Sequence, residues 1–145
     1  MAKPRVLFLC TGNSARSQMA EACLRKYAGD RFDVFSAGLE PKGIHPFTLQ
    51  VMEERGFDLS EHTSKDLGQF FGKVDFAYLI TVCDNAEQRC PIFPGTGVRL
   101  HWSFEDPAAY TGNPEEGLAK FRQVRDQIDA RVRSWLESMG IVVRF

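Results

Sequence analysis

Short apolar runs alternate with helically spaced apolar positions along the first part of the chain. Residues 6–9, with the sequence Val-Leu-Phe-Leu, form a continuous apolar run that predicts a buried strand. From Met19 to Tyr27 the apolar side chains recur at helical spacing, so residues 16–28 are predicted to form an amphipathic helix. Residues 32–37 are rich in aromatic and β-branched side chains, which predicts a second strand.

The middle of the chain continues this alternation. Pro46 suits the first turn of a helix that ends at Gly56, and a short, weaker helix is expected to begin near Thr63 or Ser64. Residues 75–82 are almost continuously apolar, which is typical of a central strand in a parallel sheet.

The last part of the chain contains a fourth strand and the longest helix. The strand is predicted within residues 98–104, where His101 and Trp102 are expected to be packing groups at its edge. Asn113, followed by a proline and two acidic residues, is typical of a helix start. Apolar side chains then recur at steps of three and four up to Gly140. This alternation of strands and helices favours an α/β fold, in which helices cover both faces of a parallel sheet.

Length and composition fit a single globular domain over residues 1–145. Of the 145 residues, 43% are hydrophobic and 26% are charged. The 18 basic and 19 acidic residues give a net charge of -1, which argues against nucleic acid as a partner. No apolar stretch approaches the ~20 residues of a membrane helix, and the N-terminal apolar run stops at Cys10, unlike a signal peptide. We therefore expect a monomeric, cytoplasmic protein with no membrane partner.

The residues after the first strand combine a cysteine, small polar residues and an arginine. In order they are Cys10, Thr11, Gly12, Asn13, Ser14, Ala15, Arg16 and Ser17. Between a strand and a helix, the backbone N–H groups of such a loop can point inward and bind an oxyanion. The Arg16 guanidinium can grip two oxygens of that anion. The same positive field favours the thiolate of Cys10, so one loop is predicted to bind the substrate and activate the nucleophile.

The chain has four cysteines, which are Cys10, Cys23, Cys83 and Cys90. In a cytosolic protein, chemical roles are more common for cysteine than structural disulfides. Cys23 lies on the apolar stripe of the first helix and is predicted to be a core residue. Zinc is not expected, because there is no Cys-x-x-Cys pair and the three histidines lack ligand spacing. Cys83 and Cys90 are candidates for redox chemistry, with buried small hydrophobes as the alternative interpretation.

Three candidate groups follow predicted strands. Cys10 ends the first strand, Cys83 ends the third, and Asp106 follows the fourth in a turn before a proline. Ligands of open α/β sheets bind at this edge of the sheet, so the three groups converge on one crevice if the first and third strands are neighbours. For Asp106, a simple turn-forming role is the alternative.

Three segments resemble a known family. Residues 10–22, CTGNSARSQMAEA, resemble the phosphate-binding loop and first helix of the low-molecular-weight tyrosine phosphatases and arsenate reductases. Residues 81–91, TVCDNAEQRCP, resemble the redox segment of the thioredoxin-coupled arsenate reductases, and residues 101–107, HWSFEDP, match their acid loop. The resemblance covers nearly the whole chain and implies a flavodoxin-like fold with a four-stranded parallel sheet.

The resemblance also implies that arsenate is reduced to arsenite by a relay of three cysteines. In that relay Cys10 attacks arsenate held by the loop and Arg16, and Asp106 protonates the departing oxygen. Cys83 then expels arsenite by forming a disulfide with Cys10. Finally Cys90 attacks Cys83, and thioredoxin reduces the resulting Cys83–Cys90 disulfide.

Further roles around the loop follow from the same resemblance. Ser17 is expected to stabilise the Cys10 thiolate, and Asn13 is expected to fix the shape of the loop. Some relatives bind potassium through Asn13, Glu21, Ser36, Thr63 and a following acidic residue. Here Lys65 lies beside Asp66, and its ammonium group can replace the cation. No metal or organic cofactor is therefore expected.

Helix geometry predicts a conformational change in residues 83–90. If the segment were helical, its two cysteines would lie about 10 Å apart along the helix axis, at a rise of ~1.5 Å per residue. A disulfide needs Cα atoms within roughly 4.4–6.8 Å of each other. We therefore expect this segment to loop out when Cys83 and Cys90 are oxidised.

Two other functions would use parts of the same machinery. A phosphatase for phosphotyrosine or small phosphate esters needs Cys10, Arg16 and Asp106 and leaves Cys83 and Cys90 idle. The alanines after Asp106 and its proline, in place of tyrosines, favour a small inorganic substrate. A non-catalytic oxyanion or redox sensor would not need Asp106. Glutaredoxin and mycothiol are the alternatives to thioredoxin as reductant.

Overall fold

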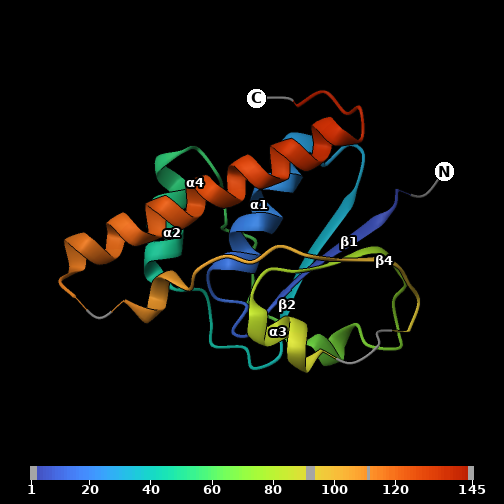
Figure 1. Ribbon diagram of the computed structural model, residues 1–145, viewed down its shortest axis with the longest axis horizontal. Helices are drawn as coiled ribbons and strands as arrows, with labels where there is room; N and C mark the ends of the chain where they lie inside the picture. Colours follow the sequence, from blue (N-terminus) through green and yellow to red (C-terminus); the bar gives the residue numbers. More distant parts are fainter. Residues whose placement is uncertain (1–2, 91–93, 111, 144–145) are drawn as a thin grey trace.

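Four parallel strands form the centre of the molecule (Figure 1). The computed structural model describes residues 3–90, 94–110 and 112–143. Its strands are β1 (Arg5–Cys10), β2 (Asp33–Gly38), β3 (Phe76–Thr81) and β4 (Thr96–His101), in the spatial order β2-β1-β3-β4. Each neighbouring pair is parallel. The predicted α/β fold is confirmed, and the first and third strands are neighbours.

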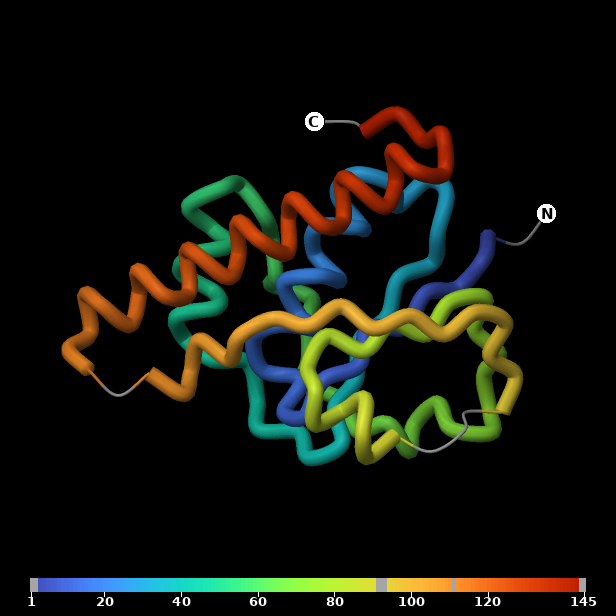
Figure 2. The backbone as a smooth tube through the Cα atoms, viewed as in Figure 1, coloured from blue at the N-terminus to red at the C-terminus, as the bar shows by residue number. Residues whose placement is uncertain are grey.

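Helices cover both faces of this sheet (Figures 1 and 2). They are α1 (Arg16–Ala28), α2 (Pro46–Glu54), α3 (Asp84–Arg89) and α4 (Pro114–Ser138), together with the one-turn 3-10 helices η1 (Leu67–Gln69) and η2 (Pro107–Ala109). Helices α1 and α4 pack together on one face with α2 against α4, whereas α3 lies on the other face. Among the described residues, no helix has both the length and the apolar character needed to cross a lipid bilayer.

The hydrophobic core contains side chains of the two central strands, β1 and β3, and of the helices packed against the sheet. The predicted apolar run of residues 6–9 is completely buried, because β1 has a neighbouring strand on each side and helices on both faces. Cys23 is also completely buried in α1, which confirms it as a core residue. Trp102 is buried as predicted, with its ring centroid 5.9 Å from that of Phe8.

The short helix expected to begin near Thr63 or Ser64 begins later and is shorter than predicted. Only the single turn of η1 forms, and its N-cap is Asp66, whose carboxylate accepts from the Gly68 N–H at 2.6 Å. The preceding backbone is instead held beside β2, since the Lys65 carbonyl accepts from the Gly38 N–H at 2.8 Å. Pairing with β2 therefore takes the place of the predicted helical hydrogen bonds.

The fourth strand is shifted from the predicted range of 98–104. It begins at Thr96, which pairs with Phe76, and it ends at His101. The Trp102 N–H still donates to the Thr81 carbonyl of β3 at 2.8 Å. The chain then turns toward the loop after β1, where the Phe104 carbonyl accepts from Arg16 Nη1 at 3.1 Å.

Candidate active site

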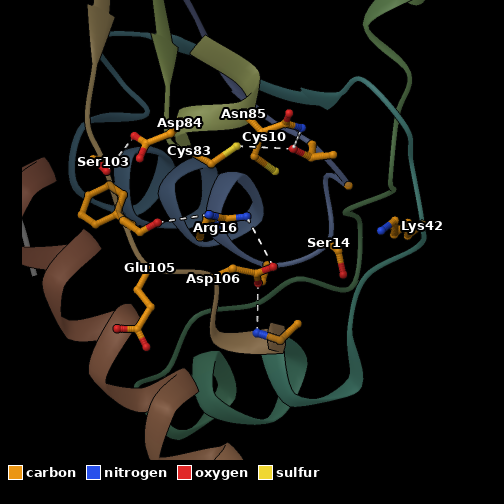
Figure 3. Close-up of a pocket in the computed structure, with 15 residues that line it drawn as sticks. Cys10, Ser14, Arg16, Lys42, Cys83, Asp84, Asn85, Ser103, Glu105 and Asp106 are labelled. Atoms are coloured by element: carbon orange, nitrogen blue, oxygen red, sulfur yellow. Dashed lines mark hydrogen bonds and ion pairs between the residues drawn. The ribbon is translucent and has the colours of Figure 1, made fainter. Parts of the chain in front are cut away.

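A pocket of about 530 Å³ lies where β1, β3 and β4 end (Figure 3). Cys10, Cys83 and Asp106, which follow three different strands, all line this pocket. The sequence-based expectation that they converge on one crevice is therefore confirmed. The other predicted loop residues that line it are Thr11, Gly12, Ser14, Ala15 and Arg16. Asn13 and Ser17 are completely buried and do not line it.

Asn13 holds the loop in shape. Its backbone φ of 45° is in the left-handed region, which asparagine adopts more readily than most residues. Its side-chain amide donates to Ser17 Oγ at 2.8 Å and to Ser36 Oγ at 2.9 Å. Its Oδ1 accepts from the Lys65 N–H at 2.7 Å. These bonds connect the loop to α1, to β2 and to the segment before η1.

Ser17 supports the sulfur of Cys10. The Cys10 side chain is buried, and its Sγ lies 2.8 Å from Ser17 Oγ. Because Ser17 Oγ accepts from Asn13, its own hydrogen remains available to donate to the sulfur. The contact thus places a hydroxyl donor against the sulfur of Cys10.

Arg16 connects the loop to the acid-loop segment after β4. Its Nη1 donates to the Phe104 carbonyl, and its Nη2 lies 3.7 Å from Asp106 Oδ2. The other oxygen of Asp106 accepts from the Ala108 N–H at 3.0 Å and so caps η2. The Asp106 side chain is 45% exposed, so its carboxyl group is open to the pocket and to solvent.

Cys83 enters the pocket from the start of α3. It is the N-cap of this helix, and its Sγ accepts from the Ala86 N–H at 3.4 Å. The same Sγ lies 3.5 Å from the hydroxyl of Thr11, which in turn accepts from Asn85 Nδ2 at 2.7 Å. The second predicted thiol is thus held against the loop that carries Cys10.

Cys90 is separate from the pocket. It caps the opposite end of α3 and is 7% exposed, and it does not line the cavity. Burial raises the pKa of its thiol, while the nearby Arg99 guanidinium acts in the opposite direction. None of the four cysteines forms a disulfide. The structure therefore brings Cys10 and Cys83 together but not Cys90.

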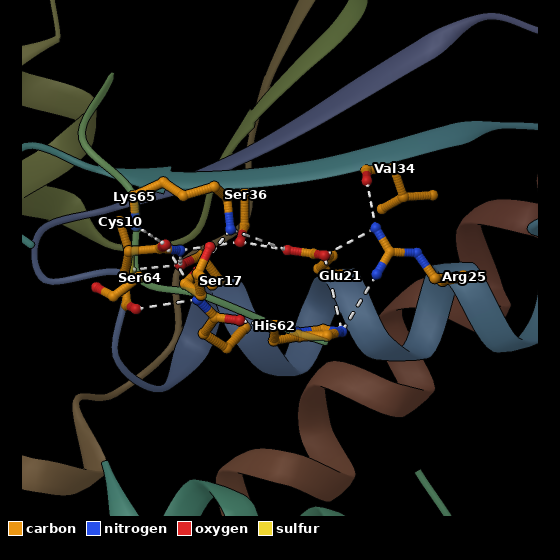
Figure 4. A network of polar contacts seen from close by, with 12 residues as sticks. Cys10, Ser17, Glu21, Arg25, Val34, Ser36, His62, Ser64 and Lys65 are labelled. Atoms are coloured by element: carbon orange, nitrogen blue, oxygen red, sulfur yellow. Dashed lines mark hydrogen bonds and ion pairs between the residues drawn. The ribbon is translucent and has the colours of Figure 1, made fainter. Parts of the chain in front are cut away.

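A buried hydrogen-bonded chain supports the loop from behind (Figure 4). Gln18 Nε2 donates to the side-chain and main-chain oxygens of Asn13 at 3.0 and 3.1 Å. Gln18 Oε1 lies 2.8 Å from His62 Nδ1, and burial lowers the pKa of this histidine. A neutral ring with its proton on Nδ1 completes the chain, because an amide oxygen can only accept.

Glu21 is a buried carboxylate beside the same network (Figure 4). It accepts from Ser36 Oγ at 2.5 Å and pairs with Arg25 at 2.8 Å. Lys65 Nζ lies 3.9 Å from Glu21 Oε1 and donates to the Thr63 carbonyl at 2.6 Å. Burial lowers the pKa of Lys65, and the negative charge of Glu21 opposes this effect. The oxygens at this position thus already have an ammonium group as a neighbour.

Sequence reasoning missed several residues of the site. Lys42, Asn85 and Ser103 line the pocket, but none of them was predicted. Asn85 and Ser103 lie inside the segments 81–91 and 101–107, where only the cysteines and Asp106 were assigned roles, and Lys42 lies in a segment without a motif. Gly38 is required by close packing, because a Cβ there would lie 2.7 Å from both Asn13 N and Thr11 O. The only indication of this role in the sequence is that Gly38 directly follows a predicted strand, where a glycine often marks the close approach of another backbone.

The expectation that His101 is a packing group is wrong. Its Nδ1 lies 2.8 Å from Thr81 Oγ1, and its Nε2 lies 3.0 Å from Asp84 Oδ1. The end of β4 therefore carries a polar cluster that contacts α3, because the start of α3 brings a carboxylate within reach of the ring.

The whole of this architecture matches one known family. Residues 5–142 match the family model described as low molecular weight phosphotyrosine protein phosphatase. The chain belongs to this family. Its resemblance to the family, and the implied fold, are therefore confirmed.

Within this family, the chain is similar to proteins named as arsenate reductases. It is 45% identical to an arsenate reductase of Halalkalibacterium halodurans over 95% of this chain and 99% of that protein. A solved arsenate reductase in its phosphate-binding state has a TM-score of 0.79 and 32% identity, covering 93% of this chain and 98% of that one. A thioredoxin-dependent arsenate reductase of Corynebacterium glutamicum has a TM-score of 0.71 and 32% identity, covering 95% of this chain and 62% of that one.

Proposed function

We propose that this protein reduces arsenate to arsenite through Cys10, Cys83 and Cys90. The observation that carries the proposal is the placement of Cys10 and Cys83 in one pocket beside Arg16. Reduction of arsenate needs two electrons, which two thiols supply when they form a disulfide. A phosphatase has no use for the second thiol. The arsenate reductases among the relatives support the same substrate.

The loop after β1 binds the arsenate. Its main-chain N–H groups lead into the N-terminus of α1, where partial positive charge favours an anion. Arg16 adds a guanidinium group with five N–H donors. One N–H of its Nη1 donates to the Phe104 carbonyl, and others can donate to the arsenate. Residues 11–15 form this anion-binding loop, and Ser17 supports it from the first turn of α1. Lys42 adds a positive charge at the edge of the pocket.

In the first step the Cys10 thiolate attacks arsenic. Ser17 stabilises the thiolate before the attack, since its Oγ lies 2.8 Å from the sulfur. Asp106 donates a proton to the departing oxygen, which leaves as water. This step forms the S–As bond, and arsenic remains As(V).

In the second step Cys83 attacks the sulfur of Cys10. The S–S bond forms as the S–As bond breaks, and the electron pair of the S–As bond stays on arsenic. Arsenic is thereby reduced to As(III) and leaves as arsenite, while the two thiols are oxidised to the Cys10–Cys83 disulfide. Thr11 and the Ala86 N–H both contact Cys83 Sγ and orient it for this attack.

In the third step Cys90 attacks Cys83 and releases Cys10 as a thiolate. Cys83 and Cys90 cap opposite ends of α3, so they are about 10 Å apart along an intact helix, beyond the ~4.4–6.8 Å of a disulfide. Residues 83–90 therefore loop out, which also exposes the new disulfide to its reductant. Thioredoxin is the proposed reductant, as in the Corynebacterium relative. We also propose a cytoplasmic location, because reduced thiol partners are abundant there, and we propose that the protein acts as a monomer.

Steady-state arsenate reduction with thioredoxin, thioredoxin reductase and NADPH tests this proposal. The Cys83→Ser variant is expected to lose turnover with arsenate while it still hydrolyses p-nitrophenyl phosphate slowly through Cys10. Cys23→Ser is the matched control, because Cys23 is a core thiol outside the pocket, and it should retain turnover. Undiminished arsenate turnover in Cys83→Ser would overturn the relay.

Phosphate ester hydrolysis is the second candidate activity. The family description and the placement of Cys10, Arg16 and Asp106 in one pocket support it. The residues after Asp106 and its proline are Ala108 and Ala109, which offer no aromatic surface for a phosphotyrosine ring. We therefore propose hydrolysis as a weak side reaction, and higher kcat/KM for a phosphotyrosine peptide than for arsenate would reverse this order.

We also propose that no metal or organic cofactor takes part and that Lys65 provides the cation behind the loop. Its Nζ lies close to Thr63 O and Glu21 Oε1, which are oxygens that would suit a potassium ion. Activity of the wild-type protein should be equal in potassium and sodium chloride. The Lys65→Ser variant should be activated by potassium, and strong potassium activation of the wild-type protein would contradict this role.

A further inference from the structure

The C-terminal end of α3 is attached to the edge strand β4 by an ion pair. Arg99 Nη2 lies 3.1 Å from Glu87 Oε1, and Arg99 Nε donates to the same oxygen at 3.2 Å. Arg99 Nη2 also donates to two main-chain carbonyls, that of Glu87 at 3.2 Å and that of Cys90 at 3.4 Å. One side chain of β4 therefore binds a side chain of α3 and the backbone at its end. We call this pair the Arg99–Glu87 clamp.

The carboxylate of Glu87 is itself fixed by the ends of β3 and β4. Thr81 Oγ1 donates to Glu87 Oε2 at 2.5 Å. His101 Nδ1 lies 3.5 Å from the same oxygen, and its Nε2 contacts Asp84 at the start of α3. Glu87 and Arg99 are each about one-third exposed, so both remain in contact with solvent. The clamp thus joins α3 to the ends of β3 and β4, and its two charged groups remain accessible to solvent.

Helix α3 depends on such contacts because it is short. It has six residues, and an isolated helix of this length is not stable in water. The last carbonyls of a helix have no partner within the helix, and a cationic side chain can satisfy them. Arg99 does this at the end where Cys90 lies. Arg89, the last residue of α3, also lies 3.5 Å from Glu40. Both of these side chains are about half exposed, so this ion pair contributes little to the stability of α3.

We propose that Arg99 is a positioning residue for Cys90, and that the Arg99–Glu87 clamp keeps α3 wound until the Cys10–Cys83 disulfide has formed. This inference rests on the proposed function, because it assigns a control point to the third step of the relay. Opening of the clamp frees Cys90 from the end of α3 and lets it approach Cys83.

The controlled step is a thiol–disulfide exchange without net oxidation. The Cys90 thiol releases its proton to solvent, and the thiolate attacks Cys83 Sγ. The Cys83–Cys90 bond forms as the Cys10–Cys83 bond breaks, and Cys10 leaves as a thiolate. Burial raises the pKa of Cys90, so its thiol stays protonated while α3 is wound. Early attack on Cys83 is therefore opposed both by the distance between the two cysteines and by the protonation of Cys90.

Hydrogen exchange of the reduced, full-length protein tests the clamp directly. The Arg99→Lys variant keeps the positive charge near Cys90 but cannot bridge the carboxylate and two carbonyls with one planar group. We expect the amides of Glu87 and Cys90, which donate to Cys83 O and Ala86 O, to exchange about fivefold faster, as for the loss of a partly exposed ion pair. Glu87→Gln should act in the same direction.

Arg122→Lys is the matched control. Arg122 forms a comparable pair with Glu54 through Nε and Nη2, but this pair joins α4 to α2 and does not contact α3. The control should leave the exchange of α3 amides unchanged. Equal exchange of these amides in wild type, Arg99→Lys and Glu87→Gln would overturn the clamp.

A single turnover with one equivalent of arsenate measures the consequence for the relay. Samples are quenched by alkylation at successive times, and their disulfides are mapped by mass spectrometry. We expect Arg99→Lys to convert the Cys10–Cys83 disulfide to the Cys83–Cys90 disulfide about fivefold faster than wild type or Arg122→Lys. An unchanged conversion rate overturns the role of the clamp alone. If wild type forms neither disulfide, the proposed function itself fails, and the role of the clamp in the relay fails with it.

Discussion

Ser17 Oγ lies 2.8 Å from Cys10 Sγ, at the start of the helix that follows the loop. The hydroxyl accepts from Asn13 and is left with one hydrogen to donate to the sulfur. The loop between β1 and α1 therefore holds the sulfur and the hydroxyl in contact. We expect this contact to contribute to the reactivity of Cys10.

Replacement of Ser17 by alanine should slow the reaction of Cys10. Loss of a hydrogen bond to a charged acceptor is expected to lower the rate of Cys10 alkylation by iodoacetamide at neutral pH by about tenfold. Turnover with arsenate should fall by a similar factor. Ser138→Ala is the control, because Ser138 is exposed at the end of α4, where its hydroxyl donates to the Trp135 carbonyl. Equal alkylation rates in Ser17→Ala and wild type would show that the contact does not activate the thiol.

Asn13 contributes both a left-handed backbone and a buried amide. The variants Asn13→Ala and Asn13→Gly lose the same side-chain bonds, but only glycine adopts the observed φ of 45° without strain. We expect Asn13→Ala to be less stable than Asn13→Gly by about 1 kcal/mol, as measured by urea denaturation. A more stable alanine variant would mean that the loop does not depend on this conformation.

Asp106 is expected to act in catalysis and not in binding. Its carboxyl group faces the pocket, whereas we propose that the loop and Arg16 hold the anion. The Asp106→Asn variant should lower kcat for arsenate by about 100-fold, the lower range for loss of a general acid. Phosphate should inhibit wild type and variant with similar inhibition constants. A variant with normal kcat would favour the turn-forming interpretation of Asp106.

Much of this site follows from the sequence because its residues lie at strand ends. The C-terminal ends of parallel strands lie at one edge of the sheet. Once the strands are predicted from local patterns, the proximity of Cys10, Cys83 and Asp106 follows although they are far apart in the chain. The cap of α4 at Asn113 is predicted for a similar reason, since it depends on local chemistry alone.

Contacts between segments without a periodic pattern were not predictable in this way. The segment before η1 is extended because its backbone bonds to β2 and to the side chain of Asn13. Nothing in the sequence of the segment itself indicates these two partners. His101 looks like a strand-edge residue until α3 brings Asp84 beside it. The Arg99–Glu87 clamp likewise joins a strand and a helix whose relative placement depends on the whole fold.

Cys23 should make the protein less stable at alkaline pH. Burial raises the pKa of this thiol well above its ordinary value, so the folded protein keeps it neutral when the unfolded chain ionises it. Its stabilising contribution is complete below the unfolded pKa of about 8.5 and is lost as pH rises toward the folded pKa. Between these values the free energy of unfolding of wild type should fall more steeply than that of Cys23→Ala, by about 1.4 kcal/mol per pH unit. Parallel denaturation curves above pH ~9 would contradict this effect.

A single turnover of the Cys90→Ser variant tests whether electrons reach arsenate from Cys10 and Cys83. Without the third thiol the relay should stop after one arsenite per protein. We expect one equivalent of arsenite and a Cys10–Cys83 disulfide in the peptide map. Arsenite produced while Cys10 and Cys83 both remain alkylatable thiols would contradict this expectation.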